Sequence, residues 1–159
     1  MRTRTALTSF APGSGARVQP RAHLDSSAEV IDLAGQWDFS YSHSAEGAGD
    51  EAPTKDFDTS GWDSITVPSH WVLTGGGEFG AFGKYGAPAY QNIEFPFPVD
   101  VPNVPDHNPT GDYRTHFELS AAQRAGADRI YLRTLGIESL AVVWVNGREA
   151  GEIRGSRLT

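Results

Sequence analysis

The chain has 159 residues, no cysteine and a formal net charge of −7 at pH 7. Its length suits a single domain but not a barrel of eight strands and eight helices, which needs about 250 residues. The absence of cysteine excludes disulfides and thiolate metal sites, and the negative charge argues against a nucleic-acid partner, because binding to phosphates needs clustered lysine and arginine.

Residues 1–30 are predicted to form a flexible, partly disordered N-terminal arm, and residues 31–159 a single domain. The arm is rich in arginine and contains the cluster Pro12-Gly13-Ser14-Gly15, which favours mobility. A draped arm explains this composition better than a binding tail. No apolar run is long enough for a signal peptide or a membrane span, so we expect a cytoplasmic protein without a membrane partner.

Alternating apolar and polar side chains predict several short strands. Trp37, Phe39 and Tyr41 share one face, as in a half-buried strand. Residues 140–145 are apolar on both faces, which is typical of a buried central strand. Together with 18 glycines and 10 prolines, this pattern predicts an all-β fold, an antiparallel jelly roll or β-sandwich. Strands are expected at residues 36–42, 65–67, 112–119, 129–135, 140–145 and 149–153.

Two local motifs mark where elements begin and end. Asn146-Gly147 is the strongest hairpin signal in the chain, because both central residues of a type I′ turn need a positive φ. Ser120-Ala-Ala-Gln123 is a capping-box pattern that Gly126 closes, which predicts one short helical turn.

A glycine-rich segment at residues 74–86 contains Gly75-x-Gly77-x-x-Gly80. This spacing matches a dinucleotide-binding fingerprint, but such a fingerprint needs a strand before it and a helix after it. The residues that follow, Ala-Phe-Gly-Lys-Tyr-Gly, disfavour a helix. A flexible surface loop is therefore the better interpretation.

Residues 89–117, which we call the ribbon, combine prolines with aromatic rings. Each proline fixes φ, removes a backbone donor and favours an extended residue before it. The ribbon is therefore predicted to be a stiff, extended segment with few backbone hydrogen bonds, anchored by its rings. Its prolines are Pro96, Pro98, Pro102, Pro105 and Pro109, and its rings are Tyr90, Phe95, Phe97, Tyr113 and Phe117.

No motif in the chain identifies a catalytic centre. The histidines show neither the i, i+4 spacing of a helical metal site nor a His-x-His pattern on a strand, and no Gly-x-Ser-x-Gly elbow supports a serine hydrolase. The tryptophans invite a sugar-stacking interpretation, but packing is favoured for each of them, most clearly for Trp37 and Trp144. The residues alone indicate a soluble β-sandwich and no particular function.

Several short motifs stand in a characteristic order along the chain. They are Leu33-Ala-Gly35-Gln-Trp37-Asp-Phe39, Val67-Pro68-Ser69-His70-Trp71, Tyr90-Gln-Asn92-Ile-Glu-Phe95-Pro96-Phe97, Val101-Pro102-Asn-Val104-Pro105, Asn108-Pro109-Thr110-Gly111-Asp-Tyr113-Arg114, Gly136-Ile-Glu-Ser139, Val143-Trp144-Val145-Asn146-Gly147 and Gly155-Ser156-Arg157. From about residue 20 to the end, this order resembles the N-terminal domain of glycoside hydrolase family 2, and in particular that of its large β-galactosidases.

The resemblance implies a jelly-roll sugar-binding domain of the galactose-binding type. In the family, an immunoglobulin-like sandwich and an eight-stranded catalytic barrel follow this domain. The implied reaction is retaining hydrolysis of terminal non-reducing β-D-galactosides by two glutamates of the barrel. Because this chain lacks the barrel, the resemblance implies a domain truncated at its C-terminal end, which supports an active site and is inactive alone.

The resemblance also implies one substrate-binding residue. In these β-galactosidases an asparagine on the proline-rich ribbon reaches the sugar pocket and hydrogen-bonds a galactose hydroxyl, and Asn92 holds its place in the motif. An amide suits this role because it both donates and accepts. Gln91 and Glu94 depart from the family pattern beside it. The alternative is that Asn92 caps a turn through an Asx-type hydrogen bond.

The remaining expectations concern ligands and partners. We expect no cofactor or metal within this chain, whereas the resemblance implies Mg²⁺, and often Na⁺, near the barrel of a full-length, homo-oligomeric enzyme. Its partners would be the β-galactoside substrate and the downstream domains. Two alternatives stay open: a β-glucuronidase or β-mannosidase of the same family, and a free-standing, non-catalytic carbohydrate-binding module.

Overall fold

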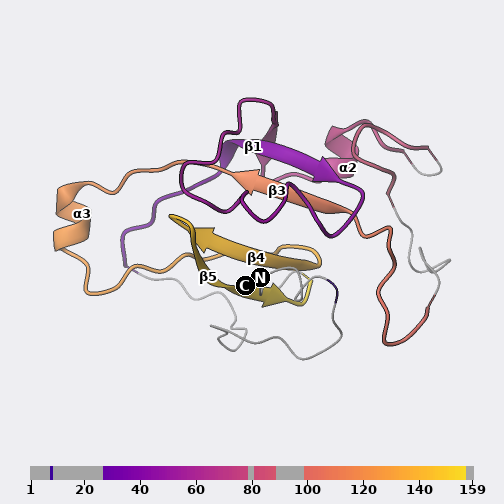
Figure 1. Ribbon diagram of the computed structural model, residues 1–159. Helices are drawn as coiled ribbons and strands as arrows, with labels where there is room; N and C mark the ends of the chain where they lie inside the picture. The colour runs from indigo at the N-terminus through magenta and orange to yellow at the C-terminus, as the bar shows by residue number, and fades with distance from the viewer. Residues whose placement is uncertain (1–7, 9–26, 79–80, 89–98, 157–159) are drawn as a thin grey trace. The chain divides into compact units, whose positions relative to one another are not determined.

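The computed structural model describes residue 8 and residues 27–78, 81–88 and 99–156. These residues fold mostly as strands, and the helices among them, α2 (Trp71–Thr74) and α3 (Ala121–Ala125), are short (Figure 1). The chain divides into two compact units. Unit 1 comprises residues 1–11 and 34–115, and unit 2 comprises residues 12–33 and 116–159. Each is described by itself below.

Unit 1 is built on a three-stranded antiparallel sheet with the order β2-β1-β3. The central strand β1 (Gly35–Ser42) pairs with β2 (Asp63–Val67) on one side and with β3 (Thr110–Arg114) on the other. Phe39 stands opposite Asp63 in one ladder and opposite Tyr113 in the other. Phe39 therefore lies on the central strand, with a paired residue on each side.

The core of unit 1 lies on the face of β1 that bears Phe39. Phe39 is 0% exposed and Ile65 is 1% exposed. The Phe39 ring meets Tyr85 edge-on at 5.0 Å between centroids and Tyr113 at 4.8 Å. Gly111 lets Trp71 lie directly on β3, because a Cβ at this position would collide with the indole ring. The face predicted from the alternation of β1 is thus confirmed as the core face.

Two side chains of β3 hold the acidic connection between β1 and β2. The Oδ2 atom of Asp112 accepts a hydrogen bond of 2.7 Å from the backbone N–H of Ala48. The guanidinium of Arg114 donates to three backbone carbonyl oxygens of the connection. Its acceptors are the carbonyl oxygens of Ala52 (3.0 Å), Thr54 (2.5 Å) and Lys55 (2.9 Å).

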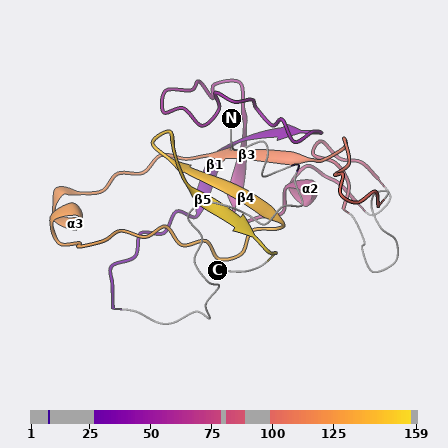
Figure 2. The same ribbon diagram turned by 60° about the horizontal axis from the view of Figure 1, so that its bottom comes forward.

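Unit 2 contains a two-stranded sheet formed by β4 (Leu140–Val145) and β5 (Arg148–Arg154). The predicted hairpin is confirmed: Asn146 and Gly147 join the strands with φ values of 51° and 77°. The predicted helical turn is confirmed as α3, which Ser120 and Gln123 close in a reciprocal capping box. Both views show α3 at the tip of a long excursion of the chain, away from the β4–β5 hairpin (Figures 1 and 2).

The all-β, antiparallel class predicted from the sequence is confirmed, but three predicted strands need correction. Residues 129–135 form no strand, because no described segment pairs with them, and all of them except Thr134 are exposed. The strand expected at residues 112–119 ends at Arg114, where its pairing with β1 stops. Residues 140–144 are half-buried and Val145 is exposed, and the strand is not central, because among the described residues only β5 pairs with it.

Candidate functional site

The residue predicted to bind substrate, Asn92, lies outside the described residues, as do residues 89–98 around it. The ribbon was predicted to be extended, but its described part before β3 turns at residues 101–102, where the backbone N–H of Asn103 donates to the carbonyl of Asp100 over 2.7 Å. The role of Asn92 therefore stays a prediction.

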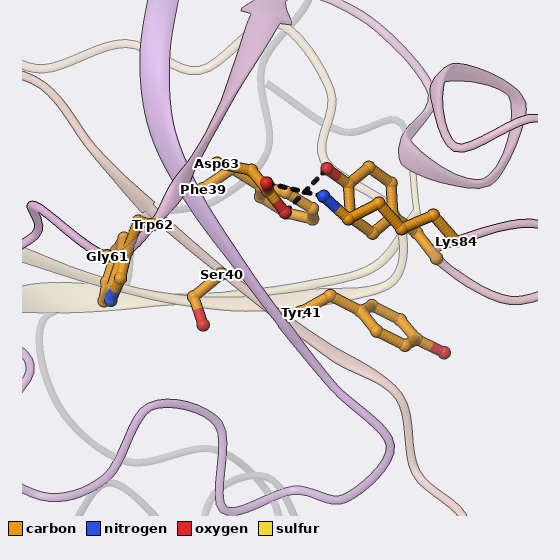
Figure 3. A pocket seen from close by; sticks show the side chains of 8 residues that line it. Phe39, Ser40, Tyr41, Gly61, Trp62, Asp63 and Lys84 are labelled. Atoms are coloured by element: carbon orange, nitrogen blue, oxygen red, sulfur yellow. Dashed lines mark hydrogen bonds and ion pairs between the residues drawn. The ribbon is translucent and has the colours of Figure 1, made fainter.

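A groove in unit 1 combines aromatic and charged side chains, and we call it the edge groove. It has a volume of about 190 Å³. Figure 3 shows the groove from close by, with Trp62 towards one end and Lys84 towards the other. The residues that line it are Phe39, Ser40, Tyr41, Gly61, Trp62, Asp63, Lys84 and Tyr85.

The groove exists because two strands of the sheet differ in length. β2 begins at Asp63, opposite Phe39, whereas β1 continues to Ser42. Ser40 and Tyr41 therefore pair with β3 on one side and have no β2 partner on the other. Residues 84 and 85 of the glycine-rich segment line this open edge, and Phe39 lies at its base with no exposed surface.

The glycine-rich segment is anchored in its described part and is not the loose surface loop that its composition predicted. Tyr85 is buried in the core, and the backbone N–H of Lys84 donates to the carbonyl of Gly75 over 2.8 Å. Gly83 packs so closely on the backbone of residues 75–77 that a Cβ would not fit. The helix α2, and not a strand, comes directly before Gly75, and the described residues after Gly80 form a turn at residues 84–85 and no helix, so the arrangement needed for a dinucleotide is absent from the described residues.

A carboxylate with two donors forms the polar end of the groove. The ammonium of Lys84 donates to Oδ1 of Asp63 over 2.6 Å, and the hydroxyl of Tyr85 donates to Oδ2 over 2.9 Å (Figure 3). The hydrogen bond from Lys84 holds the pKa of Asp63 below its usual value, with a smaller contribution from Tyr85. The same hydrogen bond raises the pKa of Lys84, so both groups are charged at neutral pH.

The apolar end of the groove is formed by Trp62. Its indole is half-buried and lies 5.7 Å from the ring of Phe57 between centroids. By contrast, Trp37 and Trp71 pack against the core, which confirms the interpretation given to them from the sequence. Tyr41 has both roles: it packs against the core and also lines the groove.

Sequence reasoning did not bring the groove residues together. Asp63 and Lys84 are separated by 21 positions, and Lys84 sits in a segment whose glycines pointed to a mobile loop. An aromatic residue such as Tyr85 was only a weak signal of anchoring, because Phe82 of the same segment is 80% exposed. Among the described residues, no group of three or more His, Cys, Asp or Glu could hold a metal ion, and no described helix is long and apolar enough to cross a membrane.

Comparison with known families identifies the protein family of the chain. Residues 30–159 match the model of the glycosyl hydrolases family 2 sugar-binding domain. The chain therefore belongs to glycoside hydrolase family 2, through its sugar-binding domain. This agrees with the resemblance carried by the ordered motifs.

Several curated relatives of the chain carry the name β-galactosidase. The chain is 43% identical to a β-galactosidase of Arthrobacter sp. (strain B7) over 96% of its own length and 16% of that protein's. It is 35% identical to β-galactosidases of Vibrio vulnificus (strain CMCP6), over 96% of the chain and 14% of the relative, and of Kluyveromyces lactis, over 89% and 13%. The chain thus spans less than one fifth of the length of these relatives.

Proposed function

We propose that this chain is the sugar-binding part of a β-galactosidase that hydrolyses terminal non-reducing β-D-galactosides. The observation that carries the proposal is the identity of 43% to a protein named β-galactosidase, over nearly the whole chain. The relatives' names also favour a galactosidase over the related β-glucuronidases and β-mannosidases. Rates with aryl β-galactosides, β-glucuronides and β-mannosides test that preference directly.

In the proposed enzyme the bond-breaking groups are two glutamates of a downstream barrel. One protonates the leaving oxygen, and the other forms a covalent glycosyl intermediate that water then hydrolyses. This chain supplies neither glutamate, so we expect it to be inactive alone. The described residues offer no ligand set for the Mg²⁺ of the family enzymes, and the role proposed for this chain is argued without that ion.

The contribution of this chain to the reaction is Asn92. Its amide can donate to one lone pair of a galactose hydroxyl and accept the proton of the same or a neighbouring hydroxyl. The prolines of the ribbon restrict the backbone beside it, which lowers the entropy lost when the amide is positioned. A role as a turn cap would leave the sugar without this contact.

The kinetic effect of Asn92→Ala in the full-length enzyme tests this role. We expect a loss of about 1–3 kcal/mol of transition-state stabilisation, the size of a buried polar group left without its partner. The measurement is kcat/KM with an aryl β-galactoside. Asn103→Ala is the matched control, because Asn103 also lies on the ribbon and its amide donates to Asp100 on the surface.

Two results would contradict the proposal. Unchanged kcat/KM in Asn92→Ala would remove Asn92 from the active site. Coding DNA that stops after the codon of Thr159, with no barrel sequence nearby, would instead favour a free-standing carbohydrate-binding module. An open frame that encodes the barrel and its two glutamates is the expected outcome.

A further inference from the structure

Two imidazole rings of unit 1 lie side by side where β1 ends. His43 directly follows β1, and His107 lies on the ribbon shortly before β3. Their rings are stacked, with centroids 5.9 Å apart and planes inclined to each other by 29°. The two residues are far apart in the sequence, so neither the i, i+4 spacing nor the His-x-His pattern of a local metal site reveals the pair.

The sheet holds the backbone of both histidines. Ser42, the last residue of β1, is paired with Thr110, the first residue of β3. Beyond this pair, the backbone N–H of Asn108 donates to the carbonyl of His43 over 3.0 Å. The His43 ring also meets Tyr41 edge-on, at 5.0 Å between centroids. The two imidazoles therefore project from the same end of the β1–β3 ladder.

The ring nitrogens of both histidines are accessible to a ligand. His43 and His107 are exposed, and none of the hydrogen bonds found among the described residues involves either ring. A neutral imidazole has one nitrogen that accepts, and such nitrogens are the commonest metal ligands in proteins. The stacking of the two rings leaves both of these lone pairs unused.

The separation of the rings suits one shared metal ion. Two imidazoles that bind one ion at about 2.0 Å have ring centroids roughly 4.5–6 Å apart, for angles at the ion between about 90° and 140°. The observed 5.9 Å lies at the upper end of this range. Rotation about the side-chain bonds, for which the terminal torsion of histidine has broad minima, aims one nitrogen of each exposed ring at the same ion.

The chemistry of the two ligands selects the class of ion. Imidazole nitrogen suits Zn²⁺, Ni²⁺ and Cu²⁺, whereas Mg²⁺ and Ca²⁺ take oxygen ligands. Two protein ligands leave the other coordination positions to water, so the site is open, unlike the closed four-ligand sites of structural zinc. Glu46 and Asp106 follow His43 and precede His107 closely in the chain, and the net charge is −7. This negative charge favours a cation.

We propose that His43 and His107 together bind one divalent transition-metal ion of the class that prefers imidazole: Zn²⁺, Ni²⁺ or Cu²⁺. The ion links the end of β1 to the ribbon, and two side chains suffice for this chelate where no group of three is found among the described residues. The site goes beyond the proposed function, because it contains neither Asn92 nor the oxygen ligands that the Mg²⁺ of the family enzymes requires.

Titration of the 159-residue chain with Ni²⁺ tests the proposal. Calorimetry gives the stoichiometry, and NMR of the imidazole C–H signals identifies the ligands, because bound Ni²⁺ is paramagnetic and broadens the signals nearest to it. We expect saturable binding of one ion per chain and selective broadening of the signals of His43 and His107. Excess Mg²⁺ should not displace the Ni²⁺, because Mg²⁺ takes oxygen ligands.

Matched variants locate the ion. We expect His43→Gln and His107→Gln each to weaken Ni²⁺ binding about tenfold to a hundredfold, because the loss of either ring removes the chelate. His70→Gln is the control, since His70 is an exposed histidine of unit 1 outside the pair. The two variants alter different segments, so a folding defect in one, seen by circular dichroism, leaves the other as the test, and the broadening experiment needs no variant.

Four outcomes would overturn the proposal: no saturable binding of Ni²⁺, undiminished binding by a folded His43→Gln or His107→Gln, one ion bound per two chains, or displacement of Ni²⁺ by Mg²⁺. The third would show that the histidines act between molecules, and the fourth that carboxylates hold the ion. None of them bears on the proposed function, because the effect of Asn92→Ala on kcat/KM is measured in the full-length enzyme.

Discussion

Unit 1 and unit 2 differ in how much apolar surface they cover. The buried apolar side chains of the described chain, Phe39, Ala52, Ile65, Val72 and Tyr85, all belong to unit 1. In unit 2, no described apolar side chain is buried, and Ile130 and Tyr131 are 61% and 77% exposed. Isolated two-stranded sheets are marginal in water, and about three strands with an apolar face are needed for independent stability. Unit 1 therefore meets the conditions for a stable sheet, whereas unit 2 depends on further packing.

The same substitution in both units gives the largest expected contrast. Phe39→Ala should destabilise unit 1 by about 3–5 kcal/mol, because it opens a cavity beneath three neighbouring rings. Phe117→Ala in unit 2 should cost less than about 1 kcal/mol, because this ring is already half exposed. Urea unfolding followed by tryptophan fluorescence measures both. Equal losses would show that unit 2 has a core of comparable quality.

The sequence predicted unit 1 better than unit 2, and the reason is pairing. Trp37, Phe39 and Tyr41 alternate on a strand that has a partner on each side, so the local pattern and the tertiary structure agree. Residues 129–135 contain residues that favour strands, such as Ile130, Tyr131 and Thr134, but no described strand pairs with them. A strand-like sequence shows that a segment is suited to a sheet, and only the rest of the structure provides the partner.

The candidate site was harder to predict than the fold. Asp63 and Lys84 meet only because β2 starts opposite Phe39 and Tyr85 anchors the glycine-rich segment in the core. Neither the strand boundary nor this anchoring follows from local propensity, and glycine content alone favoured a mobile loop. The motifs of the ribbon identified the family, but sequence order gives no geometry for Asn92.

Unit 1 also contains a partly buried carboxylate, Asp112, and its substitution is a second test with a smaller expected change in stability. Burial raises the pKa of Asp112, while the hydrogen bond from the backbone of Ala48 lowers it by less. A raised pKa in the folded state means that the protonated form is favoured on folding. The resulting stability is fully present below the pKa of an unfolded aspartate and is lost as the pH rises through the folded pKa.

Asp112→Asn should therefore stabilise unit 1 at neutral pH by about 0.5–1 kcal/mol, because the amide keeps an oxygen for Ala48 without a buried charge. The gain should disappear at low pH, where the wild-type carboxyl is protonated. Urea unfolding at several pH values measures the difference. The control is Asp106→Asn, which removes an exposed charge of the ribbon. A destabilised variant at neutral pH would show that the charge itself holds the connection.

Substitutions of exposed side chains in unit 2 should change the free energy of unfolding least, by less than about 0.5 kcal/mol. Their main effect should be on association between molecules of the chain. Large apolar patches and unpaired extended segments promote contacts between molecules. We expect the wild-type chain to self-associate, and Leu132→Lys to shift it towards monomer in sedimentation experiments. Leu73→Lys is the control, since Leu73 is an exposed leucine of unit 1 (61%, against 50% for Leu132). A wild-type chain that stays monomeric at every concentration, or a control that dissociates it equally well, would mean that residues 129–135 of unit 2 do not drive association.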